Sequence, residues 1–96
     1  MDLDELRFRL TQCNRALLEI QYCYDEALEL HEMLLGRKST MENHIPPTPE
    51  IEHYLSLLEE EIMYANETLE RARLGLEFCS NTRVNIERQM NVNPGR

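Results

Sequence analysis

The stretch "LLGRKSTMENHIPPTPE", residues 34–50, interrupts a chain that otherwise consists of helix-forming residues with a regular apolar repeat. Gly36 tolerates the left-handed conformation that ends many helices. Arg37 and Lys38 follow it, where cations interact favourably with the last carbonyl groups of a helix. We therefore expect a first helix to end at about residue 36.

The second half of this stretch both prevents a helix from continuing and starts the next one. The prolines of residues 46–49 lack backbone donors and disfavour the helical conformation of the residues before them. Thr48 is a good N-cap, and Pro49 suits the first helical position. The predicted organisation is a single helical-hairpin domain at 1–96, with helix 1 at about 2–36, a loop at about 37–48, helix 2 at about 49–91 and a tail at 92–96.

Both predicted helices carry apolar residues at alternating three- and four-residue spacings, which is the seven-residue repeat of coiled coils. Since each apolar seam needs a partner and the connection is short, we predict an all-α fold, an antiparallel αα-hairpin with heptad seams. Counting outward from the expected loop places Leu34 near Ile51. The residues expected in the hairpin or oligomer seams are Leu3, Leu6, Leu10, Leu17, Ile20, Tyr24, Leu34, Ile51, Leu55, Leu58, Ile62, Leu69, Leu76, Ile86 and Met90.

Further apolar residues flank these seams, and one hairpin cannot cover them. A wide apolar face indicates contact with more than one neighbouring helix. We therefore expect a second chain to complete a four-helix bundle, either a second copy or another helical subunit. The expected partner surface comprises Phe8, Leu18, Tyr22, Leu28, Leu57, Tyr64 and Phe78.

The composition argues against several classes of partner. Eighteen acidic and ten basic residues give a net charge of −8, which disfavours nucleic acid and anionic membrane surfaces. No stretch approaches the roughly 20 apolar residues of a membrane span, and the acidic N-terminus does not resemble a signal peptide. Cys13, Cys23 and Cys79 form an odd set without metal-ligand spacing, so we expect reduced, buried thiols. The predicted location is intracellular, cytoplasmic or nuclear.

The acidic residues concentrate near the turn, whereas arginines are numerous toward the open end of the hairpin. Two copies packed with their turns together would bring two acidic clusters into contact. An antiparallel homodimer, with turns at opposite ends, avoids that repulsion. We therefore expect the antiparallel arrangement if the chain pairs with itself.

Features that could suggest site chemistry have simpler structural explanations. The spacing of Glu50 and His53 occurs in carboxylate metal bundles, but those sites need a second such motif. The carboxylates of residues 59–61 point in three directions along a helix and cannot act as a pair. His31 occupies a seam position, where a glutamate partner would satisfy it. Thr48 precedes a proline, the minimal pattern of proline-directed phosphorylation, although its capping role already explains it.

The sequence therefore predicts no catalytic residue, metal, cofactor or small-molecule substrate. The expected function is protein–protein interaction, as a dimerising or hetero-oligomerising coiled-coil scaffold or adaptor. Two other functions remain open: a small regulatory or inhibitory protein that binds an enzyme or receptor through one hairpin face, and a pH- or metal-responsive helical bundle.

Overall fold

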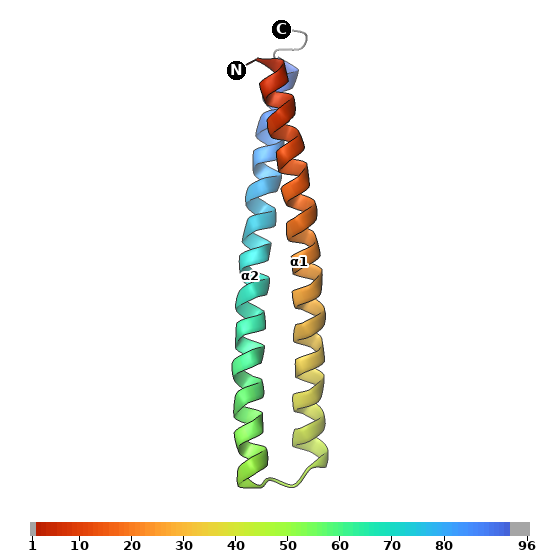
Figure 1. Cartoon of the computed structure of the whole chain (residues 1–96), viewed down its shortest axis with the longest axis vertical. Coiled ribbons are helices and arrows are strands. Elements are labelled where there is room, and N and C mark those ends of the chain that lie inside the picture. Colours follow the sequence, from red (N-terminus) through yellow and green to blue (C-terminus); the bar gives the residue numbers. More distant parts are fainter. Residues whose placement is uncertain (1, 93–96) are drawn as a thin grey trace. The chain divides into compact units, whose positions relative to one another are not determined.

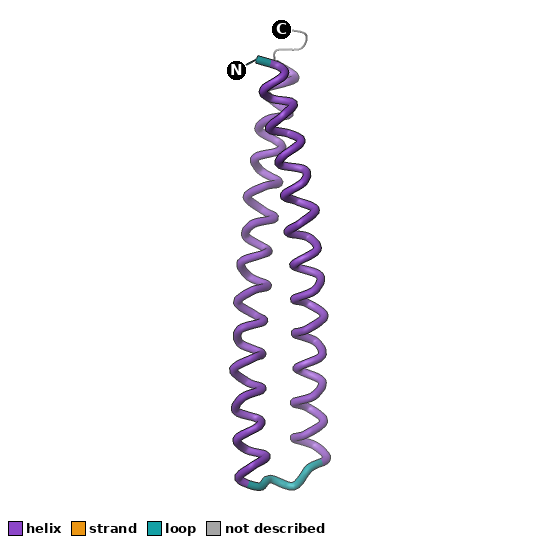
Figure 2. Tube along the Cα trace, in the orientation of Figure 1, coloured by secondary structure: helices purple, strands orange, loops and turns teal. Residues whose placement is uncertain are grey.

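The computed structural model describes residues 2–92, and most of the predicted tail at 92–96 lies outside this range. Helix α1 spans Leu3–His44 and helix α2 spans Pro49–Val92. Four residues connect them, and the part of the chain that the structure describes contains no strand (Figures 1 and 2). The two helices run antiparallel and pack against each other, which confirms the predicted all-α hairpin.

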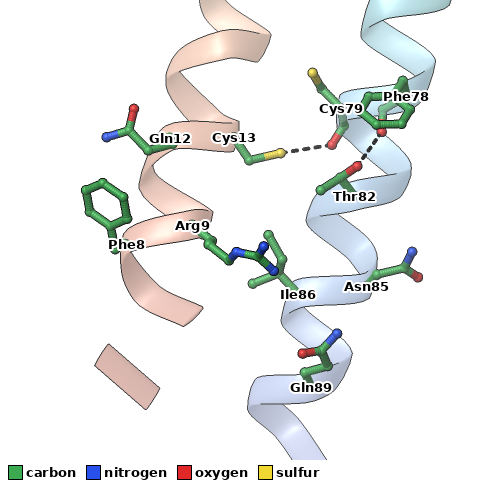
Figure 3. A pocket seen from close by; sticks show the side chains of 10 residues that line it. All are labelled: Phe8, Arg9, Gln12, Cys13, Phe78, Cys79, Thr82, Asn85, Ile86 and Gln89. Atoms are coloured by element: carbon green, nitrogen blue, oxygen red, sulfur yellow. Dashed lines mark hydrogen bonds between the residues drawn. The ribbon is translucent and has the colours of Figure 1, made fainter. Parts of the chain in front are cut away.

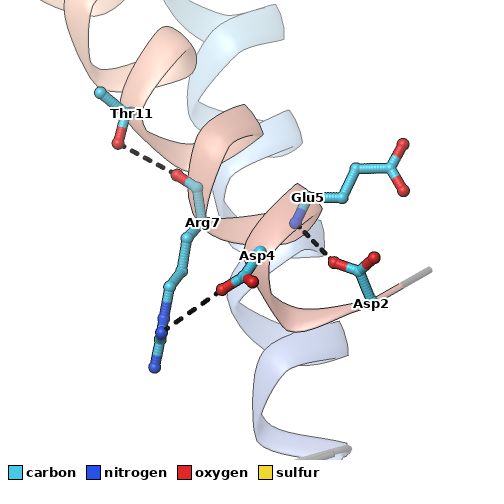
Figure 4. A network of polar contacts seen from close by, with 5 residues as sticks. All are labelled: Asp2, Asp4, Glu5, Arg7 and Thr11. Atoms are coloured by element: carbon cyan, nitrogen blue, oxygen red, sulfur yellow. Dashed lines mark hydrogen bonds and ion pairs between the residues drawn. The ribbon is translucent and has the colours of Figure 1, made fainter.

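The first turn of α1 is fixed by side-chain hydrogen bonds. The backbone N–H of Glu5 donates to Asp2 Oδ1 over 2.8 Å, so Asp2 is the N-cap (Figure 4). Asp4 and Arg7 form an ion pair of 3.8 Å one turn apart. The hydroxyl of Thr11 donates to the Arg7 carbonyl over 3.0 Å. The Asp2 contact satisfies one of the backbone donors that the start of any helix leaves unpaired.

Thr48 caps α2 as predicted. The backbone N–H of Ile51 donates to Thr48 Oγ1 over 3.2 Å, and that of Glu52 donates to the Thr48 carbonyl over 2.9 Å. Pro49 occupies the first helical position, where its missing N–H costs no hydrogen bond. The start of α2 is therefore determined by local sequence.

The predicted end of helix 1 is wrong, because α1 continues through Gly36 to His44. The backbone of Gly36 does not adopt the left-handed conformation of a C-cap, and open space surrounds the position where a Cβ would lie. A glycine inside a helix costs roughly 1 kcal/mol relative to alanine. Packing beyond Gly36 offsets that cost. The loop therefore comprises residues 45–48 and not the expected 37–48.

This packing comes from the next two seam positions of α1, Lys38 and Met41, which are both half-buried. Met41 packs against the buried cluster of Leu34, Leu58 and Ala65, which both helices contribute. Lys38 Nζ lies 3.6 Å from a carboxylate oxygen of Glu42 and 3.4 Å from one of Glu59 on α2. The heptad repeat thus extends seven residues beyond Leu34, the last seam residue expected on this helix.

The contacts divide the hairpin into two compact units, which are described separately. Unit 1 consists of segments 1–23 and 72–96, described over 2–23 and 72–92, and unit 2 consists of residues 24–71. The core of unit 1 comprises Leu6, Cys13 and Ile86, with Leu10, Cys79 and Met90 packed against them. The core of unit 2 comprises Leu34, Leu58 and Ala65, with Met41, Leu55 and Ile62 packed against them.

The register of the helices also differs from the expectation. Leu34 packs in one cluster with Leu58, seven residues beyond Ile51, because the loop is shorter than predicted. A shift of seven residues is one full heptad, so the same helix faces still meet. Every residue predicted for the seams is accordingly buried or half-buried.

Candidate protein-interaction surface

The hairpin buries few side chains and exposes many apolar ones. Among the described residues, seven apolar residues are buried, whereas sixteen large hydrophobic side chains are exposed. Isolated exposed apolar residues are normal on soluble proteins. Grooves lined by several of them are more informative, because such grooves mark interaction sites.

One groove of unit 1 lies between Phe8 of α1 and Phe78 of α2, with a volume of about 450 Å³ (Figure 3). These rings are 64% and 71% exposed. The floor contains Cys13, whose Sγ–H donates to the Cys79 carbonyl over 3.0 Å, and Ile86. The remaining lining is polar but nearly uncharged, consisting of Arg9, Gln12, Thr82, Asn85 and Gln89 with Cys79. This groove combines apolar contact area with hydrogen-bonding groups, of which Arg9 alone is charged.

Unit 1 has a second groove of about 600 Å³, which contains the predicted surface residue Leu18. Leu18 is 75% exposed and lies beside the seam residues Leu17 and Leu76. Arg83 occupies a seam position there, and its Nε lies 3.8 Å from a carboxylate oxygen of Glu87. The charge in the seam is therefore paired within its own helix.

One groove of unit 2 is lined in part by the buried Leu34 and has a volume of about 390 Å³. Leu30 lines it from α1, and Leu57 and Tyr64 line it from α2. A second groove of about 370 Å³ shares Leu30 and adds Met33. Four carboxylate side chains complete the lining of the two grooves, namely Glu26, Glu29, Glu60 and Glu61.

The heptad repeat explains why the aromatic residues of α2 remain outside the seam. Leu57, Tyr64 and Phe78 are separated by multiples of seven residues, so they share one heptad position beside the seam residues. This position flanks the hairpin contact without entering it. All three side chains are consequently exposed.

The structure divides the predicted partner surface among several places. It brings Phe8 and Phe78 together in one groove and Leu57 and Tyr64 in another. Tyr22 and Leu28 are 65% and 37% exposed, but neither lines a groove described above. Leu18 lies apart from the aromatic pair of its own unit.

Sequence reasoning missed Met33, Met63 and Leu74 as exposed apolar residues. Met33 could have been identified from its position, because it lies three residues after Leu30 and therefore on the same side of α1. Met63 and Leu74 lie away from the predicted stripes, and no pattern in the sequence distinguishes them.

The cysteines differ from the expectation of three buried thiols. Cys13 is buried and Cys79 is half-buried, but Cys23 is exposed, and all three are free. Cys23 follows Tyr22 on the solvent side of α1, one position before the seam residue Tyr24. Cys23 is exposed because a position beside a two-helix seam is covered only when a third helix packs there.

The histidines singled out from the sequence differ in exposure. His31 is half-buried at its seam position, and His53 is exposed. Among residues 2–92, no three His, Cys, Asp or Glu side chains lie close enough together to hold a metal ion. Neither described helix contains a segment that is long and apolar enough to cross a membrane.

The two units differ strongly in charge. The segments of unit 1 contain six acidic and seven basic residues, a net charge of +1. The segment of unit 2 contains twelve acidic and three basic residues, a net charge of −9. The net negative charge of the protein therefore resides in the unit that contains the Leu30, Leu57 and Tyr64 groove.

The fold and its grooves define an antiparallel helical hairpin with unpaired apolar surface. Comparison of the chain with models of known protein families, with curated proteins and with solved structures gives no match.

Proposed function

We propose that the protein is a non-catalytic interaction module that associates with another helical chain, as a scaffold or adaptor. The observation that carries this proposal is the exposure of aromatic and leucine side chains in grooves beside the hairpin seam. Fully burying one such side chain contributes about 1.5–3 kcal/mol. Burying a few of them would offset part of the entropic cost of association. A lone hairpin leaves these side chains in water.

The simplest assembly is a pair of hairpins that form a four-helix bundle. If both chains are copies of this protein, the charge difference between the units favours turns at opposite ends. Unit 2 at −9 then meets unit 1 at +1 and avoids a second unit 2. The three free cysteines support an intracellular setting, cytoplasmic or nuclear, for this assembly.

The solution mass of the purified chain tests this proposal. We expect light scattering to report at least a dimer at micromolar concentration. Replacing Phe8 and Phe78 by serine should weaken the assembly without loss of helicity, because neither ring belongs to the seam. A helical, monodisperse monomer whose mass is the same with and without these rings would refute self-association.

The orientation can be tested by spin labels at residue 42 of each copy, close to the turn. An antiparallel dimer should give separations above about 40 Å, since each helix of more than forty residues is about 60 Å long. A short distance would exclude the antiparallel arrangement, while the hairpin itself would stand.

A second candidate function is a small regulatory protein that binds another protein through one hairpin face. The acidic lining of the unit 2 grooves favours it, because carboxylates beside an apolar groove select a particular kind of partner.

A further inference from the structure

We propose that the Leu30, Leu57 and Tyr64 groove of unit 2 binds a basic amphipathic helix of another protein. This inference rests on the proposed function, protein–protein interaction, and names the chemistry of one partner. The helix would place leucine or aromatic residues in the groove and lysine or arginine residues at its edges.

The apolar part of the groove suits a helix. Leu30 lines the groove from α1, and Met33 of the adjoining groove lies one turn further along. Leu57 and Tyr64 line the groove from α2, two turns apart. Their side chains are between 44% and 69% exposed, so each retains apolar surface to bury. Seven residues of helix cover about 10 Å, which matches anchors spaced three, four and seven residues apart on a docked helix.

The edges of the groove are acidic on both helices. Glu60 and Glu61 line the groove from α2. Glu26 and Glu29 line the adjoining groove on α1, which shares Leu30 with it. All four are exposed, and no ion pair of the described chain involves any of them. A partner with cations on both sides of its apolar stripe would therefore meet carboxylates on both sides.

The cations of unit 2 do not neutralise this edge. Lys38 pairs with Glu42 and Glu59, away from the groove. Arg37 Nη2 lies 4.0 Å from Met33 Sδ, and the Arg37 side chain lines neither groove. Arg71 is the third cation, one heptad beyond Tyr64.

A second copy of this chain is a poorer occupant than a basic helix. Unit 2 of another copy would bring a second charge of −9 to the groove. Unit 1 would bring six acidic residues along with its seven basic ones, so its net attraction is small. Charge complementarity thus favours a partner with a much larger excess of lysine and arginine.

The test uses a 14-residue peptide of leucine and lysine with its leucines on one helical face, added to the full chain. Isothermal titration calorimetry measures its affinity, and sedimentation of the chain alone measures self-association. We expect saturable binding that weakens as salt rises. A peptide with glutamate in place of lysine should bind at least about tenfold more weakly, because each lost attraction becomes a repulsion.

Matched variants locate the binding site. Glu60→Gln with Glu61→Gln should weaken binding about five- to tenfold, the combined effect of two exposed charge contacts. Glu32→Gln with Glu67→Gln changes the net charge equally, but neither residue lines a described groove. That control should bind the peptide nearly as well as the natural chain.

A second pair of variants tests the apolar contact. Leu57→Ala with Tyr64→Ala should weaken binding at least about tenfold, since both anchors are lost. Leu28→Ala with Met63→Ala removes apolar side chains that are exposed outside the groove and should bind normally. Circular dichroism should show unchanged helicity in all four variants, because alanine and glutamine are good helix formers.

Equal binding of the lysine and glutamate peptides, or equal loss in the groove and control variants, would overturn the inference. If the peptide does not bind and Leu57→Ala with Tyr64→Ala dissociates an oligomer of the chain, a second copy occupies the groove. That result would refute the basic-helix partner and support the proposed function. A monomeric chain that binds no peptide would refute the basic-helix partner and the self-associating form of the proposed function.

Discussion

Replacing Leu34 by alanine should destabilise the protein far more than replacing its neighbour Leu35. The two substitutions are chemically identical and adjacent in α1, so they differ only in burial. Leu34 is 2% exposed in the core of unit 2, whereas Leu35 is 43% exposed. The comparison therefore measures the hairpin contact itself.

The structure sets the size of the two effects. Buried leucine-to-alanine changes cost about 2–5 kcal/mol, and the small core around Leu58 and Ala65 places Leu34 in the lower half, about 2–3 kcal/mol. Leu35 already lies half in water, so its replacement should cost about 1 kcal/mol or less. For a chain of this size, we expect Tm to fall by about 10–20 °C for Leu34→Ala and by less than about 8 °C for Leu35→Ala.

Thermal unfolding followed by circular dichroism gives these values. Both variants and the natural chain must be compared at one protein concentration, because self-association makes Tm depend on concentration. Equal losses of stability, or a larger loss for Leu35→Ala, would show that the assigned seam is wrong.

Three further predictions concern other levels of the fold. Ile62→Asp should abolish helicity, because it places an unpaired charge in the seam at a cost of several kcal/mol. Glu60→Lys should change helicity little. Equal helicity of the two variants in circular dichroism would contradict the assigned seam. Gly36→Ala should stabilise the protein by about 0.5–1 kcal/mol in urea unfolding, because the residue is helical and its added Cβ would meet no other atom. A loss of stability would instead indicate a helix end at Gly36. Thr48→Ala should lower the free energy of unfolding by about 1 kcal/mol, and Thr48→Asp should leave it almost unchanged, because aspartate also caps helices. Urea unfolding compares the two variants, and equal losses of stability would argue against the cap.

The sequence was sufficient for the parts of the fold that depend on local chemistry and on periodicity. The alternating apolar spacing identified the seam residues, because a heptad pattern defines which helix side meets a neighbour regardless of what that neighbour is. Thr48 and Pro49 located the start of α2, because capping involves only residues within one helical turn. The exposed positions of Leu57, Tyr64 and Phe78 followed from the same periodicity.

Only the tertiary structure decided where α1 ends and how the helices are aligned. At Gly36 the local signal for a helix end amounts to roughly 1 kcal/mol, and the packing of Met41 with the Lys38 contacts to α2 opposes it. Once α1 continues, the loop shortens and the register moves by a full heptad, a change that the sequence pattern cannot detect because every heptad presents the same faces. The sequence by itself thus determined which side chains face the other helix, and long-range packing determined which of them meet and which carboxylates surround the groove of unit 2.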